Sequence, residues 1–128
     1  MSITLDHTIV HASDKHASAA FLGGILGLDP APPWGPFAPL PIPNGVTLEF
    51  LDTEVVQRQH YAFLVDDKDF DPIFERIRQA GTRYYADPGR AQPGRINNRF
   101  GGRGVYFDDP DGHLMEVITR PYGEATRP

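Results

Sequence analysis

Apolar and polar residues alternate over residues 3–10, and His7 shares one face of that run with Leu5. A period of two predicts a β-strand. After Ser13, which we expect to cap a helix, apolar residues recur at helical spacing until Gly27. The start of the chain therefore predicts a strand followed by a helix.

Proline dominates the next segment, residues 34–43, where it permits an edge strand or a loop but no central strand. Asn44-Gly45 is a strong hairpin signal, and residues 46–51 have the composition of the strand that leaves the turn. The first part of the chain is thus expected to continue as a short antiparallel sheet.

The same order of elements then restarts. The predicted elements are a strand over residues 59–65, a helix capped by Asp69 and ended by Gly81, a strand over 82–86, a polar loop over 87–102, and a hairpin whose strands, 104–107 and 113–119, are joined by a Pro-Asp-Gly turn. We therefore expect a single domain with a weak internal repeat, made of modules 1–54 and 58–120 and a loosely held tail, 121–128.

Each half carries a histidine on its first strand and a glutamate on its last, His7 with Glu49 and His60 with Glu116. Strand parity places each of them on the same face as apolar neighbours, where an unpaired carboxylate is costly to bury. Taken singly, such a histidine is more often structural and such a glutamate is usually solvated. Their matched placement favours a divalent cation held by imidazole and carboxylate, with Zn, Ni, Mn and Fe(II) as the candidates.

Composition excludes several other kinds of site. The chain has no cysteine, so a disulfide, a catalytic thiol and a Cys-ligated metal are excluded. Its net charge is −5 and it has no cluster of Lys or Arg, which disfavours nucleic acid as a partner. The start lacks the pattern of a signal peptide, and the longest apolar stretch, residues 17–28, is too short to span a bilayer. We expect a soluble, cytoplasmic protein that acts on a small molecule.

Three segments carry a family resemblance: residues 5–10 (LDHTIV), 59–63 (QHYAF) and 105–116 (VYFDDPDGHLME). Together they resemble the vicinal-oxygen-chelate superfamily, which includes glyoxalase I, extradiol dioxygenases, fosfomycin-resistance thiol transferases and bleomycin-binding proteins. The resemblance implies an α+β fold in which paired βαβββ modules form a half-open mixed-sheet barrel, commonly completed by a homodimer. It also implies a divalent metal ion held by His7, His60 and Glu116.

Five further residues are candidates for the site. Glu49 matches the fourth ligand of glyoxalase I, and we read it as a ligand or as a displaceable general base. Tyr106 is the second candidate catalytic residue, through its hydroxyl, although it could be an ordinary strand aromatic. Arg99 and Arg103 could bind an anionic substrate from the long loop, which could equally be merely solvated, and Trp34 could wall an apolar pocket.

The resemblance leaves the reaction open, because one metal site serves several chemistries. Our first hypothesis is a glyoxalase-like lyase or isomerase that stabilises an enolate-like intermediate. An extradiol ring-cleavage dioxygenase using Fe(II) is the alternative from oxygen chemistry. A thiol transferase acting on fosfomycin and a non-catalytic drug-binding resistance protein are the remaining ones. Phe100, Gly101 and Gly102 replace polar residues of the fosfomycin branch and disfavour that substrate.

Overall fold

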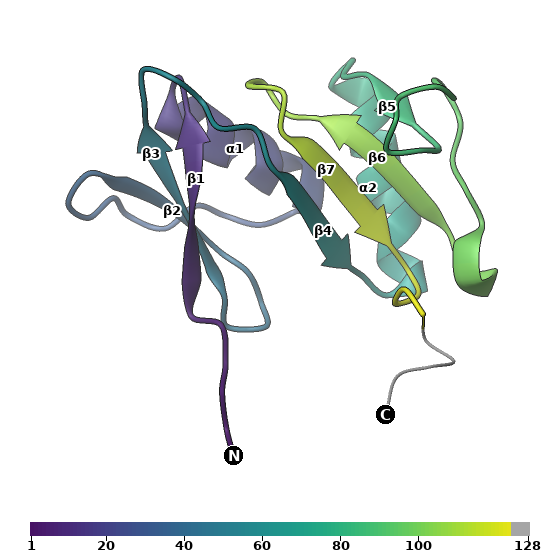
Figure 1. The fold of residues 1–128 in the computed structure, drawn as a ribbon, viewed down its shortest axis with the longest axis horizontal. Coiled ribbons are helices and arrows are strands. Elements are labelled where there is room, and N and C mark those ends of the chain that lie inside the picture. Colours follow the sequence, from purple (N-terminus) through teal and green to yellow (C-terminus); the bar gives the residue numbers. More distant parts are fainter. Residues whose placement is uncertain (124–128) are drawn as a thin grey trace. The chain divides into compact units, whose positions relative to one another are not determined.

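The computed structural model describes residues 1–123 of the chain. The chain divides into two compact units, residues 1–58 and 59–128, each with its own sheet (Figure 1). Within the described residues, no helix is long and apolar enough to cross a membrane.

Unit 1 is a three-stranded mixed sheet with one helix. Its elements are β1 (His7–Ala12), α1 (Lys15–Leu26), β2 (Phe37–Pro41) and β3 (Thr47–Asp52). The strand order is β1-β3-β2, with β1 parallel and β2 antiparallel to the central β3. The core side chains Val10, Leu22, Leu40 and Phe50 are buried, because α1 packs on this sheet (Figure 1).

Two boundaries in unit 1 differ from the sequence prediction. The strand begins at His7 and not at residue 3, because its partner β3 begins at Thr47, which lies opposite His7. The helix is capped by Asp14 and not by Ser13: Asp14 Oδ1 accepts a hydrogen bond from the backbone N–H of Ala17 at 3.1 Å. The predicted stop at Gly27 is confirmed, with a left-handed backbone at φ 75°.

Unit 1 has two strands after its helix, one fewer than a βαβββ module. The segment between α1 and β2 contains four prolines (Pro30, Pro32, Pro33 and Pro36), which have no N–H to donate to a neighbouring strand. Its only regular pairing is an isolated bridge between Trp34 and Phe37. As the sequence predicts, Pro39 lies in an edge strand, β2.

Unit 2 has the full βαβββ order. Its elements are β4 (His60–Leu64), α2 (Asp67–Gln79), β5 (Tyr84–Tyr85), a short 3-10 helix η1 (Arg99–Gly101), β6 (Gly104–Asp108) and β7 (Leu114–Ile118). The sheet order is β4-β7-β6-β5, and α2 runs along one face with Phe70, Ile73 and Ile77 buried (Figure 1). The helix begins at Asp67, so Asp69 lies in its first turn and not at the cap, where its charge still favours the helix dipole.

The predicted α+β class with mixed sheets is confirmed, and the repeat extends to the strand register. In unit 1 His7 lies opposite the residue two positions before Glu49. In unit 2 His60 lies opposite the residue two positions before Glu116. Both histidines are on strands that run parallel to the glutamate strand, so each unit presents its His and Glu on one face of its sheet. The barrel itself stays a prediction.

Candidate functional site

The face of the unit 2 sheet that α2 leaves uncovered carries His60 and Glu116 together. His60 Nε2 lies 3.0 Å from Glu116 Oε1. Glu116 is buried, with 1% of its surface exposed, whereas the His60 side chain is half exposed. The strands β4 and β7 thus bring an imidazole against a buried carboxylate, as their positions in the sequence predict.

The other ring nitrogen of His60 fixes the chemistry of this pair. His60 Nδ1 lies 2.9 Å from the carbonyl oxygen of Leu114, and since a carbonyl only accepts, Nδ1 must carry the proton and donate it. A neutral His60 therefore turns the lone pair of Nε2 toward Glu116 Oε1. A proton on Nε2, or a cation held by the two atoms, removes that repulsion.

These residues fit a divalent cation. Imidazole nitrogen and carboxylate oxygen are ligands for Zn, Mn and Fe(II), and a metal-binding histidine usually donates its second N–H to a carbonyl or a carboxylate, as His60 does. Within residues 1–123 no three His, Asp or Glu side chains gather closely enough to hold a metal ion. The third predicted ligand, His7, belongs to unit 1, so the complete ligand set stays a prediction.

A second group of side chains contacts the same carboxylate. The hydroxyl of Tyr122 donates a short hydrogen bond to Glu116 Oε2. The hydroxyl of Tyr106, a predicted site residue, lies 2.5 Å from that of Tyr122. Arg99, also predicted, donates through Nη1 to Tyr106 at 2.8 Å and to Tyr122 at 3.3 Å. Burial, and then the contacts with Tyr122 and Glu116, raise the pKa of Tyr106, so its phenol stays protonated and can donate.

Tyr122 is a residue of the site that the sequence does not predict. It lies beyond the last strand, in the segment expected to be loosely held, and residues 124–128 of that segment lie outside the described residues. In the structure its ring packs against Phe100 with centroids 5.1 Å apart, and its hydroxyl reaches Glu116. No periodic pattern connects a residue after the strand end to the strand face, so no sequence signal could have found it.

A hollow of about 390 Å³ lies over the His60–Glu116 pair. His60, Glu116 and the hydroxyl of Tyr122 supply its polar groups. The rest of its wall is apolar and consists of Ala62, Leu64, Ile118 and Pro121. This arrangement suits a small ligand with an apolar body and a few oxygen atoms at one end.

In unit 1 the structure brings two predicted residues together. Trp34 Nε1 donates to Glu49 Oε2 at 2.6 Å. Glu49 is buried, with 4% exposed, and its Oε1 has no hydrogen-bond partner among the described residues. His7 is exposed, and its Nδ1 lies 2.8 Å from Asp6 Oδ2. An orphaned carboxylate oxygen on the same sheet face as a histidine again suits a cation.

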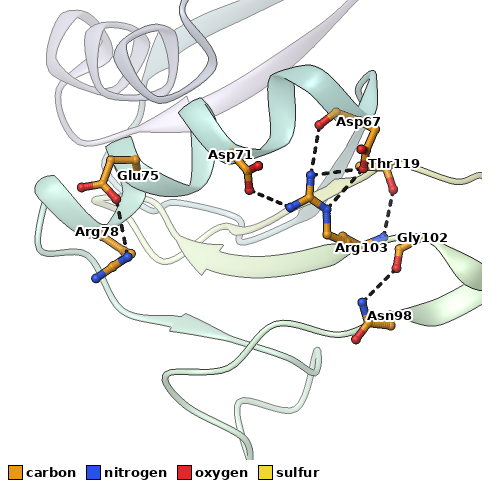
Figure 2. A network of polar contacts seen from close by, with 8 residues as sticks. All are labelled: Asp67, Asp71, Glu75, Arg78, Asn98, Gly102, Arg103 and Thr119. Atoms are coloured by element: carbon orange, nitrogen blue, oxygen red, sulfur yellow. Dashed lines mark hydrogen bonds and ion pairs between the residues drawn. The ribbon is translucent and has the colours of Figure 1, made fainter.

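Arg103, the other predicted arginine, contacts the helix α2, and Figure 2 shows its ion pairs with Asp67 and Asp71. Its guanidinium donates from Nη1 to Asp71 Oδ1 at 2.6 Å and from Nε and Nη2 to Asp67, and it lies 4.5 Å from the ring of Phe70. These three partners belong to α2. Arg103, the residue before β6, therefore links this strand to α2. Unlike Arg99, it does not contact the tyrosines beside Glu116 among the described residues.

His113 has a structural role. It is fully buried beside the β6–β7 turn, and its Nδ1 accepts a hydrogen bond from the backbone N–H of Gln59 at 3.0 Å. The backbone N–H of His113 donates a hydrogen bond to Asp109 Oδ1 at 2.8 Å, which closes the turn.

Comparison with known proteins places the chain in a family. Two solved structures, oxidase ChaP-H2 and oxidase ChaP-H1, are 58% and 54% identical to this chain with TM-scores of 0.94 and 0.92. The first covers 96% of this chain and 98% of its own, and the second covers 95% and 99%. The glutathione transferase FosA of Serratia marcescens is 28% identical over 121 residues, which cover 89% of this chain and 79% of that protein. The similar proteins named here are enzymes.

The family model described as the Glyoxalase/Bleomycin resistance protein/Dioxygenase superfamily matches residues 4–117. That match includes every residue of both His–Glu pairs and nearly the whole chain. The chain therefore belongs to the Glyoxalase/Bleomycin resistance protein/Dioxygenase superfamily.

Proposed function

We propose that this chain is a metal-dependent oxidase whose small substrate binds through adjacent oxygen atoms to a divalent cation held by His7, His60 and Glu116. The observation that carries the proposal is the 3.0 Å contact between His60 Nε2 and Glu116 Oε1, two residues that line the hollow. Identity above one half with two oxidases, over nearly the whole chain, supports oxidation as the reaction class.

Two histidines and one carboxylate form the ligand set typical of non-haem Fe(II) oxygenases, so Fe(II) is the first metal to test. When bound, the cation would polarise the substrate's oxygen atoms and stabilise negative charge on them. The residues of the chain do the rest: the Leu114 carbonyl orients His60, and the hydroxyl of Tyr122 holds Glu116.

The lining of the hollow favours a catechol-like substrate. Its apolar residues Ala62, Leu64 and Ile118 match a hydrocarbon ring, while the polar pair His60 and Glu116 matches two neighbouring hydroxyls. In extradiol cleavage one catechol and one dioxygen give one ring-opened product that keeps both oxygen atoms. A carbon–carbon bond of the ring breaks, and no external reductant is consumed.

Thiol transfer to fosfomycin is the second candidate, favoured by the 28% identity with FosA. A phosphonate would meet the apolar wall of the hollow, whose described lining residues include no Lys or Arg to pair with it. The first hypothesis from the sequence, a glyoxalase-like lyase or isomerase, receives less support, because the similar proteins named above are oxidases and a transferase. We further propose that the chain is a homodimer, which light scattering of the purified protein would test.

The deciding experiment uses protein purified without a metal-affinity tag and loaded with Fe(II) under argon. Oxygen uptake and ring-opened product are measured with catechol and 3-methylcatechol, for the wild type, His60→Ala and His16→Ala. Oxygen uptake that matches product one to one, and is lost only in His60→Ala, would support the proposal.

Two parallel assays cover the competing functions, fosfomycin with glutathione and methylglyoxal with glutathione. Turnover in either one, together with no oxygen uptake on any catechol, would replace the oxidase by the transferase or the lyase. The exposed His16 is the matched control, because it is a histidine of the same chain on the surface of α1.

A further inference from the structure

The hydrogen bonds around Glu116 run in one direction. Arg99 can only donate, so its N–H donates a hydrogen bond to the hydroxyl oxygen of Tyr106. An ionised carboxylate can only accept, so the proton of Tyr122 goes to Glu116 Oε2. In the hydrogen bond between the two hydroxyls, Tyr106 is then the donor and Tyr122 the acceptor. The series Arg99, Tyr106, Tyr122, Glu116 therefore has a fixed order of donation.

This series divides the two oxygens of one carboxylate between two tasks. Oε2 accepts from Tyr122, and Oε1 faces His60 Nε2. Because Glu116 is buried, rotation of its carboxylate would break a charge-assisted hydrogen bond at a site where a lost partner is costly. The carboxylate is thus held in the orientation in which a single oxygen points at the predicted ligand His60.

Tyr122 is itself held by contacts with Phe100 and Arg99. Phe100 packs on its ring and has a left-handed backbone, with φ 57°, which is uncommon for a residue with a bulky side chain. Arg99, the neighbour of Phe100, donates to the Tyr122 hydroxyl. The short η1 helix therefore contacts Tyr122 through the ring of Phe100 and the guanidinium of Arg99. A left-handed backbone like that of Phe100 persists where the surrounding contacts enforce it.

Unit 1 contains a counterpart with a different donor. Trp34 Nε1 donates to Glu49 Oε2 and leaves Oε1 without a partner among the described residues. Trp34 precedes its strand in the chain, whereas Tyr122 follows its strand, so the internal repeat alone does not produce the two contacts. In each unit an aromatic donor occupies one oxygen of the glutamate and leaves the other for a different partner.

We propose that Tyr122 is a positioning residue for Glu116, whose hydroxyl occupies Oε2 so that Oε1 alone serves the divalent cation. The proposal rests on the proposed function only in taking Glu116 as a ligand. A partner of this kind fixes the orientation of the ligand before the cation arrives, and its loss typically weakens metal binding.

The test uses Co(II) as the probe, because its visible absorption reports the number and geometry of its ligands. Co(II) is titrated into metal-free wild type, Tyr122→Phe and the control Tyr84→Phe, with the circular dichroism and melting temperature of each metal-free protein recorded. Tyr84 lies on β5 and packs against Phe74 of α2, so its variant loses a tyrosine hydroxyl away from Glu116. We expect Tyr122→Phe to bind Co(II) about ten-fold more weakly, with a changed absorption spectrum, and Tyr84→Phe to match the wild type.

The Co(II) titration separates this proposal from the proposed function. Wild-type affinity and spectrum in Tyr122→Phe would overturn the proposal, and so would tighter binding, which would mean that the hydroxyl competes with the cation. A wild type that binds no Co(II) would remove the metal site of the proposed function and this role with it. Tighter or unchanged binding in the variant, with a wild type that binds, would leave the proposed function standing.

Should Tyr122→Phe fail to fold, Tyr106→Phe provides the second test. It keeps the bond from Tyr122 to Glu116 and removes the proton that Tyr106 donates to Tyr122. Because linked hydrogen bonds polarise one another, we expect a smaller loss of Co(II) affinity, about three-fold. Wild-type affinity and spectrum in this variant would overturn the donor series.

Discussion

The indole nitrogen of Trp34 donates to Glu49 Oε2 across 2.6 Å, and the second oxygen of that carboxylate is buried with no hydrogen-bond partner among the described residues. An unsatisfied buried acceptor costs about 1–3 kcal/mol, so the bond from Trp34 removes that cost for Oε2. Because the indole holds one oxygen, Glu49 is restrained and its Oε1 is the atom available to a cation or a proton.

Removing the indole donor tests this restraint. We expect Trp34→Phe to lower the free energy of unfolding by about 1–3 kcal/mol, because both oxygens of Glu49 then lack a protein donor. Urea unfolding of Trp34→Phe, Glu49→Ala and the double variant measures the coupling between the two residues. Additive losses would show that the hydrogen bond contributes nothing and that Trp34 acts through packing alone.

The proposed metal ligands are tested by single substitutions. Elemental analysis and Mn(II) titration should show that His7→Ala, His60→Ala and Glu116→Ala each weaken binding at least about 100-fold, since losing a ligand costs more than losing the partner of a ligand. His16→Ala should bind as the wild type does, because His16 is exposed on α1. Equal affinity in all four variants would disprove the ligand set.

Arg103 should affect stability and not the site. Its partners Asp67 and Asp71 are mostly exposed, with side chains 78% and 76% exposed, so we expect Arg103→Ala to cost about 1 kcal/mol, less at high salt. Co(II) affinity should stay at the wild-type value. Arg78→Ala, which removes a longer surface pair with Glu75 at 3.5 Å, is the control and should cost less. A loss of Co(II) affinity in Arg103→Ala, with wild-type affinity in Arg78→Ala, would show that Arg103 contributes to the metal site.

Asp109 should give the stability an unusual pH dependence. Burial raises the pKa of Asp109 above its ordinary value of 3.8, although the backbone N–H of His113 opposes the shift. The folded chain then keeps this proton to a higher pH than the unfolded chain, so the contribution of Asp109 to stability falls as pH rises above 3.8. In Asp109→Asn that fall is absent, and the variant should gain stability relative to the wild type as pH rises above 3.8.

Asp87 provides a control of opposite sign. Hydrogen bonds from the backbone N–H of Ala91, and further along Gln92, lower the pKa of Asp87. Its contribution is present above 3.8 and is lost as pH falls through the lowered pKa. Asp87→Asn should therefore lose stability relative to the wild type as pH rises. Urea unfolding across the pH range measures both differences, and parallel curves for the two variants would contradict the assignment.

The sequence by itself determined the elements and the positions of the two His–Glu pairs. Alternation with a period of two defines which side chains share a strand face, and Gly27 and the proline-rich segment set where a helix ends and where pairing fails. These are properties of a residue and its near neighbours in the chain. For the same reason the candidates His60 and Glu116 could be named before any contact between them was visible.

Only the tertiary structure decided how the polar side chains divide among their partners. Arg99 and Arg103 belong to one polar loop in the sequence, yet one contacts Tyr106 and the other contacts α2. Tyr122 acquired its role through a contact with Glu116 that no periodicity encodes. A side chain as long as arginine or tyrosine reaches whichever partner the packed backbone places within hydrogen-bond distance, and that distance is set by the packing of strands and helix, not by local sequence.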